Sequence, residues 1–416
     1  MTDAQDRQVV ALVSGSHFVN HAYIVMVAPL VTVLAARFDV SIAAIGLAIG
    51  VQNAVILALQ LPMGYVSDAY SRTLVLGISL VVGTAGAALT ALSTSYAWLL
   101  VAQAILGVGI AGHHPAHYPL LAAVSTAENR GRAYSTHAFG GAVGLAAPFA
   151  VVAATTALGL SWRVALGIIT VAGGIFAAYC LLSFRAVDED VTKPGLAERP
   201  DERPTLASVP SRIRALVGTL TASPGILGLT LLAFLTSTAA WTIRTYTPNL
   251  LAAGYGLPDG TASALTSAML VVGAALILVG GALTDRVGAG PVVIASYALL
   301  AVVAALLSTL VLPTLALGVV LLLSGSISLS RPARSTLADL LSARADLGKN
   351  FALVTIGISL GGTIAPPLFG YLIETVGLAR SFGAVAALGA LSLALGWWIV
   401  RDAEFGIATA SAPGDD

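Results

Sequence analysis

Long apolar segments recur twelve times along this chain of 416 residues. Only 10% of the residues are charged, against about 25% in soluble domains. An α-helix needs about 20 apolar residues to cross a bilayer, so each segment is long enough for one crossing. The pattern predicts an all-α membrane protein with twelve transmembrane helices. We place the segments at 9–37, 41–66, 73–93, 97–124, 133–157, 163–184, 224–251, 261–283, 291–311, 315–338, 351–376 and 381–400.

The composition excludes several classes of protein. Twenty basic residues balance twenty acidic ones, so no bulk charge attracts nucleic acid. Cys180 is the only cysteine, which excludes a disulfide framework and a cysteine zinc site. No nucleophile–base pair, phosphate-binding loop or dinucleotide motif is apparent. We therefore expect a monomer embedded in the lipid bilayer that is not an enzyme and has no cofactor.

The distribution of Lys and Arg predicts the orientation. Loops on the side of the N-terminus carry 14 of the 20 basic residues, loops on the other side carry 3, and 3 lie within spans. Cytoplasmic loops are enriched in Lys and Arg, so both termini are expected in the cytoplasm, with the spans in the cell membrane. The predicted domains are a six-helix bundle at 1–184, a cytoplasmic linker at 185–223 with a short interfacial helix near 211–216, a second bundle at 224–400 and a cytoplasmic tail at 401–416.

The two halves of the chain match at a constant offset of 217 positions. Each half has six spans, so both halves enter and leave on the same side of the membrane. The halves are therefore parallel repeats, as expected of a two-domain transporter with its site between them. The matched pairs include Gly64 and Gly281, Asp68 and Asp285, Pro115 and Pro332, Gly140 and Gly357, Gly144 and Gly361, and Arg163 and Arg380.

Two copies of one loop motif carry a family resemblance. The run GYVSDAYSR at 64–72 follows the second span, and GALTDRVG at 281–288 follows the eighth. Both resemble the G-x-x-x-D-R-x-G-R loop of the major facilitator superfamily. The resemblance implies the twelve-helix major facilitator fold, in which spans one, four, seven and ten line a central cavity. The copies depart from the motif at Ala69, Ser71, Ala289 and Gly290.

Two shorter segments resemble the fosmidomycin-resistance branch of that superfamily: SHFVNH at 16–21 and GHHP at 112–115. The drug/proton antiporter pattern matches less well. Gln103 stands where that group carries an arginine, and Pro148 does not directly follow Gly144. The closer resemblance implies efflux of a small compound.

All six histidines lie in predicted spans of the N-terminal half. His17 and His21 are one helical turn apart and share a face. Ionisable side chains within a bilayer are costly and usually face a cavity, and histidine titrates near neutral pH. We predict substrate binding or proton coupling, with hydrogen bonding between helices as the alternative. The predicted residues are His17, Asn20, His21, His114 and His117.

For the remaining histidines, His113 and His137, hydrogen bonding between helices is the favoured role. A metal site is not predicted, because no carboxylate or thiolate lies nearby in the sequence to complete one. Gln52 in the second span is a further candidate for substrate binding, although bonding between helices explains it equally well.

Three arginines, Arg244, Arg331 and Arg334, fall within spans of the C-terminal half. A guanidinium stays charged and matches carboxylate and phosphate groups. No Asp or Glu lies in the middle of a span, so the interior is expected to be positive and to favour an anionic substrate. The alternative for Arg334, and less easily for Arg331, is snorkelling to the cytoplasmic headgroups.

The sequence thus predicts a secondary active transporter that exports a small anionic or amphiphilic compound and couples this export to protons. Uptake or exchange of an organic anion without protons stays open, and so does a membrane receptor that transports nothing. The repeated loops predict a gate, in which a carboxylate near a helix start latches one state. The gating residues are Gly64, Asp68, Arg72, Gly281, Asp285 and Arg286.

Overall fold

The computed structural model describes residues 3–126, 129–195, 211, 214, 218, 223–342 and 347–410. Every regular element within them is helical. The N-terminal half contains α1 (Asp3–Ile24), η1 (Ala28–Leu30), α2 (Val31–Phe38), α3 (Ile42–Ala69), α4 (Arg72–Ala91), α5 (Tyr96–Ala111), α6 (His113–Ala123), α7 (Arg130–Ala157), α8 (Trp162–Ser183), η2 (Phe184–Ala186) and α9 (Glu189–Thr192). The C-terminal half contains α11 (Pro224–Asn249), η5 (Leu250–Gly254), α12 (Asp259–Val287), α13 (Ala289–Ser308), α14 (Thr314–Leu323), η6 (Ser324–Leu329), α15 (Ser330–Leu340), α16 (Leu347–Val376) and α17 (Leu378–Ala410).

Among the residues that the structure describes, twelve helical stretches are long and apolar enough to cross a membrane, which confirms the predicted fold class. Their ends lie within a few residues of the predicted ones. The largest difference is at α17, which was expected to end at 400 and continues to Ala410. The predicted interfacial helix at 211–216 and most of the linker lie outside the described residues.

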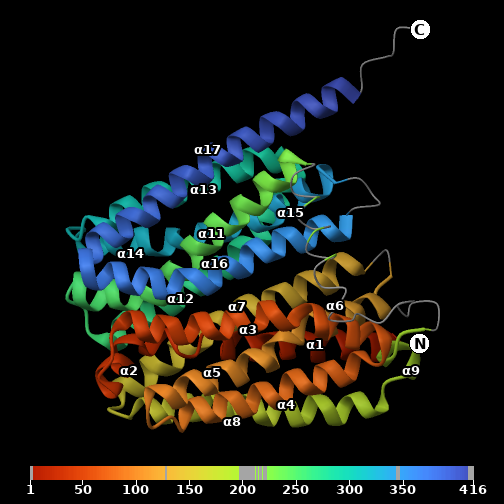
Figure 1. Ribbon diagram of the computed structural model, residues 1–416, viewed down its shortest axis with the longest axis horizontal. Coiled ribbons are helices and arrows are strands. Elements are labelled where there is room, and N and C mark those ends of the chain that lie inside the picture. Colours follow the sequence, from red (N-terminus) through yellow and green to blue (C-terminus); the bar gives the residue numbers. More distant parts are fainter. Residues whose placement is uncertain are drawn as a thin grey trace. The chain divides into compact units, whose positions relative to one another are not determined.

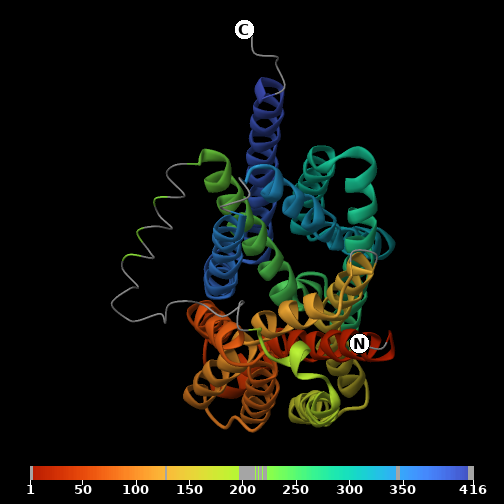
Figure 2. The same ribbon diagram turned by 90° about the vertical axis from the view of Figure 1, so that its right-hand side faces the viewer.

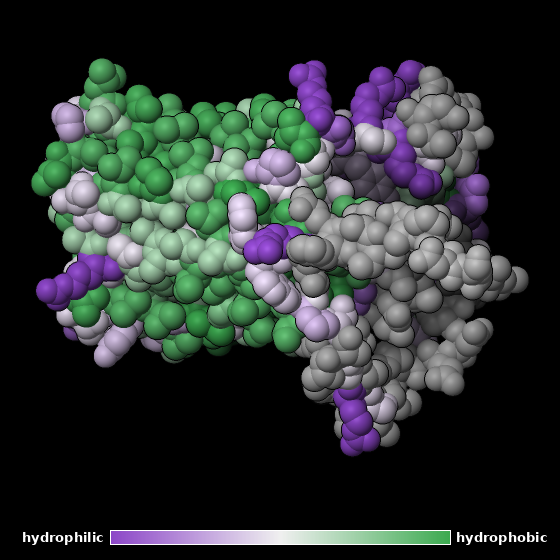
Figure 3. Space-filling view, turned by 90° about the horizontal axis from the view of Figure 1, so that it is seen from above, coloured by the Kyte–Doolittle hydropathy of each residue, from purple (hydrophilic) through white to green (hydrophobic). Residues whose placement is uncertain are grey.

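The surface of the molecule suits a bilayer. Large apolar side chains are exposed along the spans, among them Val81 at 58%, Ile175 at 67% and Val319 at 53%. Apolar residues cover most of the face seen in Figure 3, and hydrophilic ones gather toward one end of it. Exposed apolar surface on this scale is unfavourable in water but matches acyl chains. The chain is therefore a multi-pass membrane protein.

The helices form two compact units, each with its own apolar core. Unit 1 comprises Met1–Arg203, Arg244–Val271 and Thr363–Val376, and unit 2 comprises Pro204–Ile243, Val272–Gly362 and Gly377–Asp416. The core of unit 1 lies among α1, α4, α6 and α8, and that of unit 2 among α11, α13, α15 and α17. In unit 1, α1, α3, α4, α5 and α8 run side by side (Figure 1), and in Figure 2 α1, in red beside the N-terminus, lies across the view.

Close packing of glycines brings α7 against α1. A Cβ atom at Gly140 would lie 2.8 Å from the carbonyl oxygen of Ser14, and one at Gly144 would lie 2.9 Å from the Cα atom of Phe18. In unit 2, Gly361 of α16 packs in the same way against Ser237 of α11. The repeated glycines thus let two helices approach backbone to backbone, as the small-residue spacing predicts.

The fourth and tenth spans are each interrupted. α6 begins at His113 with Pro115 in its first turn, and α15 follows the short helix η6 with Pro332 in its first turn. Proline has no N–H, and its ring clashes with the carbonyl four residues earlier, so the hydrogen-bond ladder stops there. Pro115 and Pro332 match under the repeat, so the two interruptions share one cause.

We expect Gly86→Ala and Gly77→Ala, both on α4, to have opposite effects on stability. A Cβ atom at Gly86 would lie 2.5 Å from the backbone N and Cα of Leu106 in α5, whereas one at Gly77 meets only Leu181 Cδ2, at 3.9 Å. Overpacking at Gly86 should cost about 1–3 kcal/mol, while Ala at Gly77 should stabilise α4 by about 0.5–1 kcal/mol. Thermal unfolding in detergent measures both; equal midpoints for the two variants would contradict the α4–α5 contact.

Candidate functional site

The six histidines form one cluster within unit 1. They come from α1, α6 and α7 and lie ring against ring: the centroids of His113 and His114 are 3.7 Å apart, and those of His17 and His137 are 4.0 Å apart. Four of the rings are buried, whereas His21 and His114 are partly exposed. The cluster therefore has a buried interior and an accessible edge.

Two histidines of α1 donate hydrogen bonds to the backbone of α7. His17 Nδ1 lies 2.8 Å from the carbonyl oxygen of His137, and His21 Nδ1 lies 2.8 Å from that of Gly141. A carbonyl carries no hydrogen, so both Nδ1 atoms must be protonated, and in neutral imidazole each Nε2 then holds a lone pair. The two Nε2 atoms are 3.0 Å apart. Lone pairs this close repel each other unless a cation joins them.

Gly141 makes this arrangement sterically possible. A Cβ atom at position 141 would lie 2.5 Å from Nε2 and 2.6 Å from Nδ1 of His17. The glycine therefore lets the His17 ring lie flat against α7 and reach the carbonyl oxygen of His137. The two glycines thus have different roles: Gly140 leaves room for the backbone of α1, and Gly141 leaves room for the imidazole ring of His17.

A second chain of hydrogen bonds surrounds His117. Its Nε2 lies 2.9 Å from Ser16 Oγ, and its Nδ1 lies 3.1 Å from His137 Nε2. Asn20 donates to the Ser16 carbonyl at 2.9 Å and accepts from Ser79 Oγ at 3.1 Å. The structure thus places Asn20 and His117 in hydrogen bonds between helices, which is the alternative role considered from the sequence.

His113 and His114 enter the cluster from the start of α6. His113 Nδ1 donates to the carbonyl oxygen of Ile110 at 2.6 Å, so its Nε2 holds a lone pair as well. That Nε2 is buried, and no hydrogen-bond partner for it exists within the described ranges. The sequence analysis favours hydrogen bonding as the role of His113, and its Nδ1 bonds to a backbone carbonyl, that of Ile110 in the preceding helix α5.

Of the three predicted arginines, Arg334 has the most informative contact. Its Nη1 donates to Thr236 Oγ1 of α11 at 2.8 Å, and Thr236 is only 3% exposed. The guanidinium is thus held against a neighbouring helix of unit 2, which argues against snorkelling to the headgroups. Arg244 is partly exposed on α11 in unit 1, and Arg331 is exposed on α15 in unit 2.

The predicted gating loops differ in their surroundings. Arg72 is buried and donates from Nη1 to the Val191 carbonyl at 3.0 Å, which ties the start of α4 to α9. Asp68 is exposed at the end of α3, and Asp285 and Arg286 are exposed near the end of α12. At the gating glycines, Gly64 and Gly281, a Cβ atom would meet nothing within 4 Å. Gln52, the predicted substrate-binding residue of the second span, donates to the Ile24 carbonyl at 3.3 Å.

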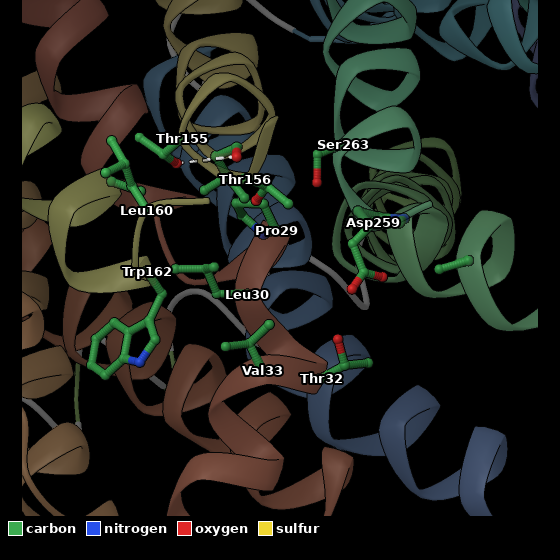
Figure 4. A pocket seen from close by; sticks show the side chains of 14 residues that line it. Pro29, Leu30, Thr32, Val33, Thr155, Thr156, Leu160, Trp162, Asp259 and Ser263 are labelled. Atoms are coloured by element: carbon green, nitrogen blue, oxygen red, sulfur yellow. Dashed lines mark hydrogen bonds between the residues drawn. The ribbon is translucent and has the colours of Figure 1, made fainter. Parts of the chain in front are cut away.

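A cavity of about 150 Å³ lies elsewhere in unit 1, between η1, α2, α7 and α12 (Figure 4). None of the histidines lines it. The Asp259 carboxylate opens onto it, so this cavity does not suit an anion. Its other polar side chains are Thr32, Thr155, Thr156 and Ser263, with hydroxyl groups, and Trp162, with an indole N–H.

Comparison with known families assigns the chain. A family model described as Major Facilitator Superfamily matches residues 13–258 and, in a second match, 229–414. The chain belongs to the major facilitator superfamily. The two matches reproduce the internal repeat, and membership confirms a membrane transporter rather than an enzyme. The resemblance to the fosmidomycin-resistance branch remains a prediction.

Solved structures show the same fold. A bacterial homologue of the human lysosomal transporter Spinster, inward-facing and unoccupied, has a TM-score of 0.74 at 16% identity over 96% of this chain and 98% of its own. The nucleoside transporter NupG has a TM-score of 0.74 at 13% identity over 94% of this chain and 99% of its own. At these identities the likeness establishes the major facilitator fold alone. No curated protein sequence matches the chain significantly.

Proposed function

We propose that this superfamily member exports a small organic anion across the cell membrane by alternating access, driven by a proton gradient. Both termini are then cytoplasmic, as the excess of Lys and Arg on their side indicates. The proposal keeps the direction and the driving ion that the sequence predicts. Its substrate class follows from the charges within the spans.

The contact that carries the proposal is the one between Arg334 and Thr236. A permanently charged guanidinium is costly inside a membrane bundle and is usually functional there. One N–H group of Arg334 donates a hydrogen bond to Thr236 Oγ1. No carboxylate of the described part of the chain forms a salt bridge with Arg334. A guanidinium with N–H groups to spare matches the two oxygens of a carboxylate or phosphonate.

The acidic residues support the same substrate class. Asp259 begins α12, and Glu374 lies in the last turn of α16, so both are near helix ends. No acidic residue neutralises the middle of a span. The charge left inside the C-terminal half is therefore positive, and an anion is the solute that it attracts.

Within the histidine cluster, we assign cation binding to the pair formed by His17 and His21. The Nε2 atoms of His17 and His21 lie 3.0 Å apart with no hydrogen between them in the neutral state. Residues in a bilayer that carry such a surplus of lone pairs are expected to serve an ion pathway or an ion site. Protons are the driving ion predicted from the sequence, so a pH gradient is the first driving force to test.

The test is flux in liposomes. Purified protein is first screened by thermal shift against organic anions and antibiotics, fosmidomycin among them, and each stabilising compound is then followed across the vesicle membrane. A gradient of one pH unit stores 1.36 kcal/mol, so coupled vesicles should accumulate the anion up to about 10-fold per proton. Exchange that persists unchanged without a gradient would select the proton-independent alternative, and binding with no flux would select a receptor.

A further inference from the structure

We propose that His17, His21, His113 and His114 bind a divalent transition-metal ion of the zinc class. All four belong to unit 1: two lie on α1, one turn apart, and two begin α6. The inference goes beyond the transport proposal and does not rest on it, because it depends only on the positions of ring nitrogens in one bundle.

The first observation is the spacing of the ligand atoms. One ring nitrogen from each of the four histidines lies within 4.8 Å of the other three. Zinc–nitrogen bonds are about 2.0–2.1 Å, so nitrogens at the corners of a tetrahedral site stand about 3.3 Å apart. The pair from His17 and His21 stands at 3.0 Å. The other distances, at most 4.8 Å, would have to shorten by no more than about 1.5 Å to bring the four nitrogens onto one ion.

The second observation is the partner of the opposite ring nitrogen. A histidine that binds a metal donates its other N–H to a carbonyl or carboxylate, which fixes the tautomer and orients the ring. His17, His21 and His113 donate in this way to the carbonyls of His137, Gly141 and Ile110. Three of the four rings thus present an Nε2 lone pair before any ion arrives.

The third observation is the nitrogen that nothing satisfies. His113 Nε2 is buried, and the structure gives it no hydrogen-bond partner within the described ranges. A single proton shared by His17 and His21 would still leave the buried His113 Nε2 without a hydrogen-bond partner, at a cost of about 1–3 kcal/mol. A metal ion bonds to all of these lone pairs at once, so it accounts for the whole group.

The donor set limits the identity of the ion. Imidazole suits zinc, copper, nickel and cobalt ions, whereas calcium and magnesium require oxygen ligands. The candidate group found within the described ranges contains only histidines. Cys180, the single thiol, is buried on α8, where it contacts the Leu12 carbonyl. We therefore expect a borderline divalent ion rather than a thiolate-bound soft one.

Cobalt(II) is the probe, because tetrahedral cobalt absorbs visible light strongly and six-coordinate cobalt only weakly. The full-length protein in detergent is treated with EDTA, freed of it, and titrated with cobalt chloride. We expect one equivalent to produce the intense spectrum, and excess zinc to abolish it. Elemental analysis of the zinc-loaded protein should then find one zinc ion per chain.

His113→Ala is the decisive variant, and His137→Gln is its matched control. Loss of a ligand should weaken cobalt binding by more than about 100-fold, since even losing an outer partner costs about 10–100-fold. His137→Gln changes a histidine of the same cluster but retains the backbone carbonyl that His17 uses, so it should keep the spectrum. If His113→Ala fails to fold, His114→Ala replaces it, since that ring is partly exposed.

A folded wild-type protein that shows only the weak spectrum, or binds no cobalt, would overturn the proposal, with a proton as the remaining occupant. Wild-type affinity in both ligand variants would overturn it too. These results are independent of flux: absence of cobalt binding leaves pH-driven transport untouched, and absence of transport leaves the cobalt spectrum untouched.

Discussion

Arg334→Ala is expected to reduce anion flux by at least about 100-fold in a protein that still folds. Arg334 lies on α15 with its guanidinium against Thr236 of α11. If it binds the anion through two N–H groups, it contributes two charge-assisted hydrogen bonds of about 1.5–3 kcal/mol each. Their loss corresponds to a factor of 100 or more, at about 1.4 kcal/mol per tenfold change. Initial rates of uptake into liposomes measure the effect.

Three further variants separate anion binding from the other roles of this arginine. Arg334→Lys keeps the charge but loses the planar fork, so its rate should fall between those of wild type and Arg334→Ala. Thr236→Val removes the hydroxyl that orients the guanidinium and should cost less than the loss of the charge. Arg380→Ala changes an exposed arginine and should have no effect. Wild-type flux of anions through Arg334→Ala would refute the anion site.

The fold follows from the sequence almost completely, because its determinants are patterns that can be read along the chain. Apolar length determines the twelve spans, and the offset of 217 positions establishes the repeat. Helix ends are less predictable: α17 continues past Arg401 to Ala410, because hydropathy marks where an apolar span ends and not where its helix ends.

The histidines of the cluster could be located along the sequence, but their arrangement, and with it the place of His113, could not be predicted. Periodicity places His17 and His21 on one face of a helix, and nothing in the sequence says that α6 brings His113 and His114 to that face. That meeting depends on the interruption at Pro115 and on the close approach of α1 and α7 at Gly140 and Gly141. Both are tertiary effects of residues that carry no chemistry themselves.

For the same reason, no metal site is predicted from the sequence: its ligands come from helices that are distant along the chain. Two histidine pairs on separate spans lack the carboxylate or thiolate expected of a site. Packing of α6 against α1 supplies the missing ligands from the second pair. The orientation of Arg334 is a second feature that the sequence leaves open. From its position, the guanidinium could turn into the bundle or toward the cytoplasmic headgroups, and only the contact with Thr236 distinguishes the two.

Gly46→Ala is expected to slow transport at a different place, the crossing of α3 and α16 in unit 1. A Cβ atom at Gly46 would lie 2.6 Å from the carbonyl carbon of Pro366, and one at Gly370 would lie 2.7 Å from Cα of Ala43. These backbone atoms cannot rotate away, and the Tyr246 hydroxyl would also lie 2.7 Å from a Cβ atom at either position. The Glu374 carboxylate also accepts the N–H of Ile42 in the first turn of α3, so the crossing is both tight and polar.

α3 and α16 come from different sequence halves, and alternating access requires contacts between the two halves to open and close once in every cycle. An added methyl group that costs about 1–3 kcal/mol in the closed crossing shifts the equilibrium toward the open form by about 5–150-fold. Flux through Gly46→Ala should fall in proportion, and Gly370→Ala should reproduce the effect from the other helix.

A cysteine placed at Thr156, in the cavity of Figure 4, should react faster with a membrane-impermeant maleimide in both variants. Gly383→Ala, where a Cβ atom meets nothing within 4 Å, is the control. Unchanged flux together with unchanged labelling would show that this crossing stays closed throughout the cycle.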